Sequence, residues 1–84
     1  MGKWRVVVTR SFERDFRGLE HDIQGRVLDA LEVLENDPYR GRKLAGVKIG
    51  RWRKRVGDYR IRYDVEGEDV VLYRVRHRRL VYGR

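Results

Sequence analysis

Hydrophobic and polar residues alternate near both ends of the chain and follow helical spacing between them. Near the N-terminus, Trp4, Val6 and Val8 fall on one side of an extended segment, 3–9, and Val7 lies on the other. This two-residue period predicts a first strand.

Two helices are expected between this strand and residue 37. Ser11 is a candidate N-cap of the first helix, and Gly18 should weaken that helix near its end. The second is expected to run from about Glu20 to Asn36, because a residue just before a proline, here Pro38, avoids helical geometry. Apolar stripes support both helices, with Phe12, Phe16 and Leu19 in the first and Ile23, Val27, Leu31 and Leu34 in the second.

Three further strands are expected after a connecting segment, 39–50. They span residues 51–56, 59–65 and 70–77, and a compact hairpin turn at Gly57-Asp58 separates the first two. The order β-α-α-β-β-β predicts an α+β fold, with a helical hairpin packed on one face of an antiparallel, mostly meander sheet. The chain, 1–84, is expected to form a single domain. Whether the first strand pairs with the last strand or lies elsewhere beside the meander is left open.

Alternation assigns opposite chemistry to the two faces of the last three strands. The face under the helices is expected to carry Trp52, Lys54, Val56, Tyr59, Ile61, Tyr63, Val65, Val71, Tyr73 and Val75. The other is expected to carry eight arginines, with Asp64, Val70 and Leu72 beside them. This set, named the arginine face, comprises Arg51, Arg53, Arg55, Arg60, Arg62, Arg74, Arg76 and Arg78.

The charge distribution points to a polyanionic partner for the arginine face. Residues 1–39 hold 6 Lys+Arg against 8 Asp+Glu, whereas residues 40–84 hold 15 against 5. Like charges opposite each other destabilise a sheet, so a functional cause is favoured. Arginine binds phosphate in bidentate fashion and stacks on bases, which favours RNA. The alternatives are an acidic protein segment and internal pairing with Asp58, Asp64 and Asp69, which are too few for eight arginines.

Composition narrows the classes of function. The chain has no cysteine, which excludes disulfides and thiolate metal sites, and neither a metal nor a cofactor is expected. No stretch of about 20 apolar residues could span a membrane, so a cytoplasmic location is expected. The sequence contains no phosphate-binding loop, no dinucleotide fingerprint and no Ser/His/Asp arrangement.

Attack of an RNA 2′-hydroxyl on the adjacent phosphate is one reaction that needs little beyond positioned cations. Arginines can orient the strand and stabilise the charge of the transition state. Because arginine stays protonated, proton transfer would fall to Lys54, Tyr82 or His77. Alternation turns His77 toward the core, which favours a packing role for it.

Three segments of the chain, LAG at 44–46, RVGDYRIRY at 55–63 and HRRLVY at 77–82, resemble the RelE/ParE toxin superfamily. The resemblance covers essentially the whole chain. RelE-like members cleave mRNA in the ribosomal A site, leave a 2′,3′-cyclic phosphate and are neutralised by an antitoxin. The resemblance therefore implies three partners, namely a cognate acidic antitoxin, the ribosome and mRNA.

The resemblance also implies roles for single residues. Arg60 corresponds to the family's central arginine, Arg78 to the one that meets transition-state charge or the leaving group, and Tyr82 to the tyrosine that stacks on the target base. Arg53 and Arg55 stand where studied members carry two lysines, one of them the proposed base. RNA contacts are expected from Lys43, Lys48, Arg51, Lys54, Arg62, Arg74 and Arg76.

Two alternative functions follow from the same residues. A ParE-like protein would inhibit DNA gyrase and cleave nothing, and the missing lysine pair favours this interpretation. A basic RNA-binding module without catalysis would use the same arginines. Cleavage of mRNA separates the RelE-like hypothesis from both.

Overall fold

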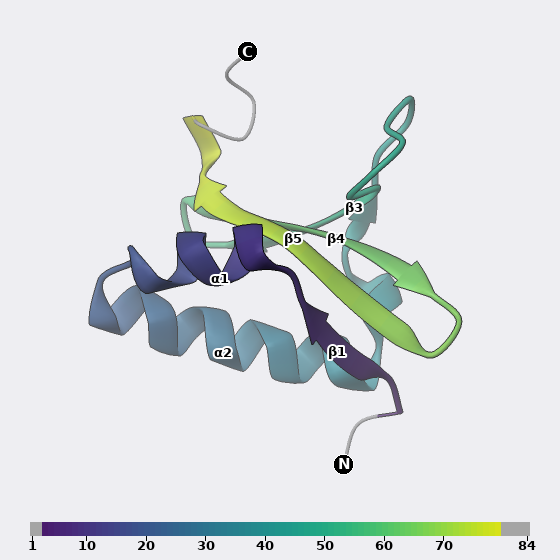
Figure 1. Cartoon of the computed structure of the whole chain (residues 1–84), viewed down its shortest axis with the longest axis horizontal. Coiled ribbons are helices and arrows are strands. Elements are labelled where there is room, and N and C mark those ends of the chain that lie inside the picture. Colours follow the sequence, from purple (N-terminus) through teal and green to yellow (C-terminus); the bar gives the residue numbers. More distant parts are fainter. Residues whose placement is uncertain (1–2, 80–84) are drawn as a thin grey trace.

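The computed structural model describes residues 3–79 and contains two helices packed on a five-stranded sheet (Figure 1). In chain order the elements are β1 (Arg5–Val8), α1 (Arg10–Arg17), α2 (His21–Asn36), a 3-10 turn η1 (Pro38–Arg40), β2 (Arg42–Lys43), β3 (Trp52–Val56), β4 (Tyr59–Glu66) and β5 (Asp69–His77). The expected α+β fold is confirmed. The short strand β2, within the segment expected to be a plain connection, was not predicted.

The helices begin and end at residues with recognisable local chemistry. Thr9, and not the predicted Ser11, caps α1, because the Thr9 Oγ1 accepts a hydrogen bond from the Phe12 N–H at 3.3 Å. The same hydroxyl donates to the Leu72 carbonyl of β5 at 2.8 Å, so the cap also fastens α1 to the sheet. Gly18 is the C-cap of α1, and α2 ends at Asn36, two residues before Pro38, as expected.

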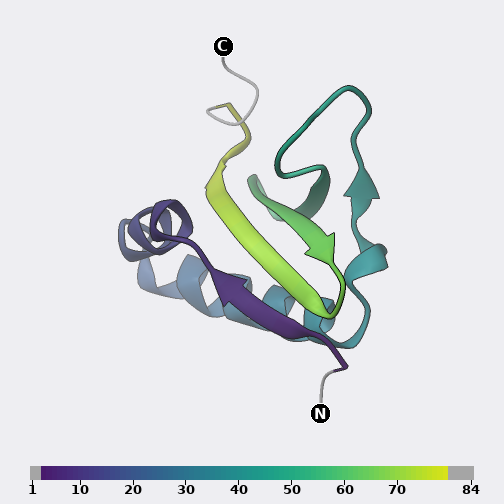
Figure 2. The same ribbon diagram turned by 45° about the vertical axis from the view of Figure 1, so that its right-hand side comes forward.

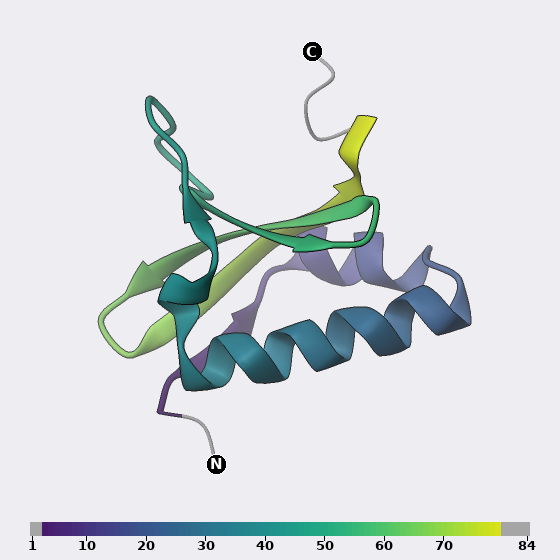
Figure 3. The same cartoon turned by 180° about the vertical axis from the view of Figure 1, so that it is seen from behind.

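The strand order in the sheet is β1-β5-β4-β3-β2. Strands β2 to β5 pair antiparallel, and β1 pairs parallel with β5, which answers the question that the sequence left open. Both helices lie on one side of this sheet (Figure 1 and Figure 3). On the other side, the segment between β2 and β3 and the end of β5 rise above the strands (Figure 2).

The core lies between the helices and the sheet. Its fully buried members include Val27 and Leu34 of α2 and Ile61 and Tyr63 of β4. Trp52 packs against this cluster as expected. Tyr63 also donates its hydroxyl proton to the Pro38 carbonyl at 2.6 Å, which ties η1 to the sheet.

A β-bulge reverses the predicted facing of the first half of β5. Arg62 pairs with Arg74, but the next residue of β4, Tyr63, pairs with Leu72, so Tyr73 is left as an extra residue. Two-residue alternation shifts by one position there. Val70 and Leu72 are therefore in the core at 0% exposure, and the predicted core positions Val71 and Tyr73 are not. Val75, beyond the bulge, is buried as expected.

Candidate functional site

Two rows of arginines cross the open side of the sheet. The first row contains Arg42, Arg53, Arg62 and Arg74, and the second contains Arg55, Arg60 and Arg76. Within each row the residues are register partners on adjacent strands, which lie about 4.8 Å apart. Six members of the arginine face thus lie in two rows, and Arg51 and Arg78 lie just beyond the ends of β3 and β5.

Arg60 is the buried centre of the second row, with 5% of its surface exposed. Its Nη1 donates to the carbonyl oxygens of Gly57 and Tyr59, at 3.0 and 2.9 Å, which ties it to the β3–β4 turn. Its Nε has no hydrogen-bond partner among residues 3–79. Burial of a cationic donor without a partner is costly. An anion bound at this position would offset that cost.

An open pocket of about 560 Å³, named the central pocket, gathers cations from β3, β4 and the residues that follow β5. It is lined by Arg53, Arg55, Arg60, Arg78 and Arg79. The Arg78 N–H donates to the Asp58 carbonyl at 2.8 Å, so the end of β5 is fastened to the β3–β4 turn. Four of the five predicted catalytic residues meet here. The fifth, Tyr82, lies outside the described residues.

Arg62 and Asp64 hold the segment that rises between β2 and β3. The buried Asp64 carboxylate accepts from the N–H groups of Gly50 and Arg51, at 3.1 and 2.7 Å. Arg62 Nε donates to the Gly50 carbonyl at 2.7 Å, and its Nη2 donates to the Ile49 carbonyl at 3.4 Å. The N–H and the carbonyl of Gly50 are thereby both fixed, and two nitrogens of the Arg62 guanidinium are engaged within the protein.

Arg74 is engaged by a carboxylate from α1. Its Nε and Nη2 donate to the two Asp15 carboxylate oxygens, at 2.8 and 3.2 Å, and the Val75 N–H donates to the same group at 3.1 Å. The hydrogen bond to Asp15 raises the pKa of Arg74. Asp15 thus closes the part of the β5 edge that β1 does not reach, and it draws Arg74 toward α1.

The acidic residues considered as internal partners have other contacts. Asp64 binds backbone N–H groups, as described above, and Asp69 pairs with Arg5 at 2.9 Å. Asp58 contributes its backbone carbonyl to Arg78. Internal pairing with these three residues therefore does not account for the arginine face.

The remaining predicted RNA-binding residues surround the two rows. Lys43, Lys48 and Arg51 are exposed, and Arg51 Nε donates to the Lys48 carbonyl at 3.1 Å. Arg76 is half-buried at the end of the second row. Lys54 pairs with Ile61 and so projects on the helix side of β3, as alternation predicted.

His77 lies on the helix side of the sheet, as predicted. It is the register partner of Tyr59, whose ring it contacts edge-on with the centroids 5.5 Å apart. Its Nδ1 accepts a hydrogen bond from the Arg79 N–H at 3.3 Å. These contacts favour packing over proton transfer. Among residues 3–79, no group of three or more His, Cys, Asp or Glu could hold a metal ion.

Sequence reasoning missed several residues of this region. Arg42 joins the first row through β2, which is two residues long and too short to produce a visible alternation. Arg79 lines the central pocket just beyond β5. Asp15 acts on β5 from 59 residues away in the chain, and no local pattern could reveal that contact.

Comparison with known proteins agrees with this architecture. A family model described as the ParE toxin of type II toxin–antitoxin systems, parDE, matches residues 6–82. Toxin RelE3 of Methanocaldococcus jannaschii is 30% identical over 83 residues, which cover 93% of this chain and 94% of that protein. In the part of the chain that the structure describes, no helix is both long and apolar enough to cross a membrane.

Solved structures of toxin–antitoxin complexes contain similar chains. One from the RelBE2 complex of Mycobacterium tuberculosis has a TM-score of 0.80 at 30% identity, covering 89% of this chain and 98% of its own length. One from the archaeal RelE–RelB complex of Pyrococcus horikoshii has a TM-score of 0.76 at 23% identity, covering 90% and 96%, and supports the fold alone. The family match and the shared identity show that this chain belongs to the RelE/ParE superfamily of toxins from type II toxin–antitoxin systems.

Proposed function

We propose that this toxin is a RelE-like endoribonuclease that cleaves mRNA in the ribosomal A site and is neutralised by a cognate acidic antitoxin. The observation that carries the proposal is the central pocket, where Arg53, Arg55, Arg60 and Arg78 converge. Guanidinium groups bind phosphate oxygens in bidentate fashion, so such a set suits a phosphodiester. The activity would take place in the cytoplasm, where the ribosomes are.

The reaction begins when an RNA 2′-hydroxyl attacks the adjacent phosphorus and the bond to the 5′-oxygen breaks. Negative charge grows on the phosphate oxygens in the transition state. We assign Arg60 to that charge, and the burial of its Nε without a partner among residues 3–79 supports this assignment. Arg78, exposed at the end of β5, is assigned to the leaving oxygen. Removal of one such preorganised donor typically costs about 10²–10³ in rate.

The proton of the attacking hydroxyl has no acceptor of the usual kind in the central pocket, whose described lining is entirely arginine. Lys54 lies on the other side of β3, and the Nδ1 of His77 is occupied by Arg79. We assign the acceptance of this proton to solvent or to a group of the ribosome, and the leaving 5′-oxygen, whose charge Arg78 meets, takes up a proton from the same sources. The chain would then supply electrostatic stabilisation and orientation, and cleavage would depend on the ribosome.

The test is translation of a defined mRNA in a purified system, followed by mapping of the 3′ ends. We expect cuts at the A-site codon that bear a 2′,3′-cyclic phosphate, only with ribosomes present, and abolished by the antitoxin. Full inhibition of translation with intact mRNA would refute the proposal.

A ParE-like gyrase inhibitor is the second candidate. The family model matched over residues 6–82 is that of ParE, and a pocket whose described lining holds arginines and no base suits binding as well as catalysis. A supercoiling assay decides between the two. Inhibition of gyrase without cleavage of mRNA would replace the first proposal by this one.

A further inference from the structure

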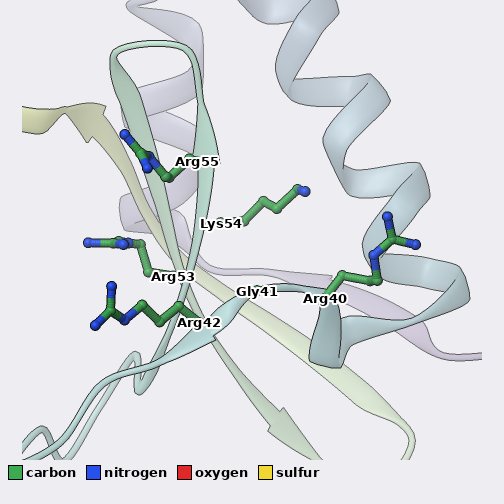
Figure 4. Close-up of a pocket in the computed structure, with 6 residues that line it drawn as sticks. All are labelled: Arg40, Gly41, Arg42, Arg53, Lys54 and Arg55. Carbon is green, nitrogen blue, oxygen red and sulfur yellow. The ribbon is translucent and has the colours of Figure 1, made fainter.

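A second basic pocket lies at the outer rim of the sheet, beside β2 and β3. This edge pocket has a volume of about 300 Å³ and is lined by Arg40, Gly41, Arg42, Arg53, Lys54 and Arg55 (Figure 4). The described lining thus consists of five basic side chains and one glycine. The central pocket uses only Arg53 and Arg55 of this set. Arg40 and Arg42 have no role so far, and Lys54 is an expected RNA contact that lies outside the central pocket.

The fold holds the edge pocket in a fixed shape. Asp37 caps η1 by accepting from the Tyr39 N–H at 3.1 Å, and Tyr63 donates to the Pro38 carbonyl, so two hydrogen bonds anchor η1. The chain then passes against β3 at Gly41. A Cβ there would collide with the Tyr63 hydroxyl and the Arg53 carbonyl oxygen, so only glycine permits this approach.

The pocket extends around the rim of the sheet. Figure 4 shows Arg42, Arg53 and Arg55 pointing to one side of β3, whereas Lys54 and Arg40 point to the other, toward α2. Arg53 and Arg55 line both this pocket and the central pocket. The two pockets therefore form a continuous basic path that leads from the open side of the sheet over its edge.

We propose that the edge pocket is a second phosphate subsite, in which Arg40, Arg42 and Lys54 hold the RNA backbone next to the nucleotides at the central pocket. The inference rests on the proposed function, because the bound strand is taken to be the RNA whose scissile phosphate occupies the central pocket. It assigns three RNA-binding residues to the sheet edge and gives Lys54 a binding role on the helix side of β3.

The lining favours RNA over an acidic protein segment. A docked protein segment usually draws much of its affinity from a few large anchors, often aromatic, that are seated in desolvated pockets. The described lining of the edge pocket offers cations and backbone, and no apolar side chain. A sugar–phosphate backbone needs only regularly spaced charge, which this lining provides.

The experiment measures binding of a 12-nucleotide single-stranded RNA with 2′-O-methyl groups at every position, which cannot be cleaved by its own 2′-hydroxyl. The test variant combines Arg40→Gln, Arg42→Gln and Lys54→Gln. The matched control combines Arg10→Gln, Arg14→Gln and Arg17→Gln, which removes the same charge from α1, outside both pockets. Affinity is measured by fluorescence anisotropy across a range of salt concentrations.

We expect the edge variant to bind this RNA about tenfold more weakly at low salt. The slope of the logarithm of the binding constant against the logarithm of the salt concentration should become less steep by about 0.7 for each phosphate that the variant no longer neutralises. The control should keep a slope close to that of the wild type. Equal reductions of affinity and slope in the two variants would overturn the inference.

Two further measurements keep the outcome interpretable. A polyglutamate peptide is titrated in parallel, and selective loss of its binding by the edge variant, with RNA binding unchanged, would assign the pocket to an acidic protein segment instead. Because the RNA cannot be cut, the result is independent of nuclease activity. If the triple variant does not fold, the single variant Arg40→Gln, at an exposed position of η1, replaces it. Its RNA binding should then depend less steeply on salt than that of the wild type.

Discussion

The helix side and the open side of the sheet share strands β3, β4 and β5 but differ in what their side chains contribute. On the helix side, Ile61, Leu72 and Val75 are almost fully buried and supply apolar contact area. On the open side, register partners carry like charges and oppose strand pairing. The first side therefore stabilises the sheet, and the proposed binding of RNA would account for the second.

The two sides also differ in how they use hydrogen bonds. Several basic residues of the open side are already engaged within the protein, Arg62 with the Gly50 segment and Arg74 with Asp15. Arg60 retains a buried nitrogen with no partner among residues 3–79. Arg60 is also tied to the β3–β4 turn through its Nη1, but unlike the other two it keeps a buried Nε that the proposed function assigns to an anion.

The largest expected effect tests which residues of β5 face the core. Leu72→Ala should lower the free energy of unfolding by about 2–5 kcal/mol, because a fully buried leucine leaves a cavity. Val71→Ala, one residue earlier and partly exposed, should cost less than about 1 kcal/mol. Urea denaturation followed by circular dichroism measures both. If β5 alternated strictly and had no bulge, Val71→Ala would lower the free energy of unfolding more than Leu72→Ala.

Most of the fold could be predicted from local patterns, and β5 shows where that approach fails. Apolar spacing predicted both helices, and alternation predicted β3 and β4 because each has a regular two-residue period. The bulge at Tyr73 depends on pairing between β4 and β5, and such pairing leaves no mark on either strand alone. The same holds for the N-cap, where Thr9 is favoured over Ser11 partly by its bond to Leu72.

The candidate site was predictable in its charge but not in its geometry. Alternation places Arg60 with Arg53 and Arg55, and the central pocket contains all three. Alternation could not show that Arg62 holds a backbone segment, nor that Arg74 pairs with Asp15, because both contacts depend on the tertiary fold. Arg40 and Arg42 were missed because η1 and β2 are three and two residues long, too short to show a periodic pattern.

A second prediction concerns function. Arg60→Ala and Arg78→Ala should each reduce ribosome-dependent cleavage by about 100-fold, as expected for the removal of one preorganised cation. Arg76→Ala, on the same face but outside the central pocket, should reduce it much less. Single-turnover cleavage at saturating ribosome concentration measures all three variants, with thermal unfolding as the folding control. Wild-type cleavage by either of the first two would remove that residue from the mechanism.

A third prediction concerns alkaline stability on the helix side. Burial raises the pKa of Tyr63 to about 12, so the folded protein keeps this phenol neutral where the unfolded chain ionises near pH 10. Between pH 10 and 12 the unfolded state therefore binds fewer protons than the folded state. The contribution of the Tyr63 phenol to the free energy of unfolding is fully present below pH 10 and is lost as the pH rises to 12. The loss of stability should reach at most about 3 kcal/mol, which is two pKa units at about 1.4 kcal/mol each.

Tyr63→Phe isolates this contribution because lysines also titrate in the same range. The variant should be less stable at neutral pH, where it lacks the hydrogen bond to the Pro38 carbonyl. The difference from the wild type should shrink between pH 10 and 12. A difference that stays constant over this interval would mean that the Tyr63 phenol titrates normally.

The smallest expected effect tests whether the open side opposes folding. Arg76→Gln removes one charge from the pair with Arg60 and should raise the free energy of unfolding by a few tenths of a kcal/mol at low salt. At 1 M salt, where the Debye length is about 3 Å, the gain should largely disappear. Arg10→Gln, on exposed α1, should show no comparable gain. If Arg76→Gln instead destabilises the protein at low salt, the arginine rows contribute to folding, and the contrast between the two sides of the sheet is wrong.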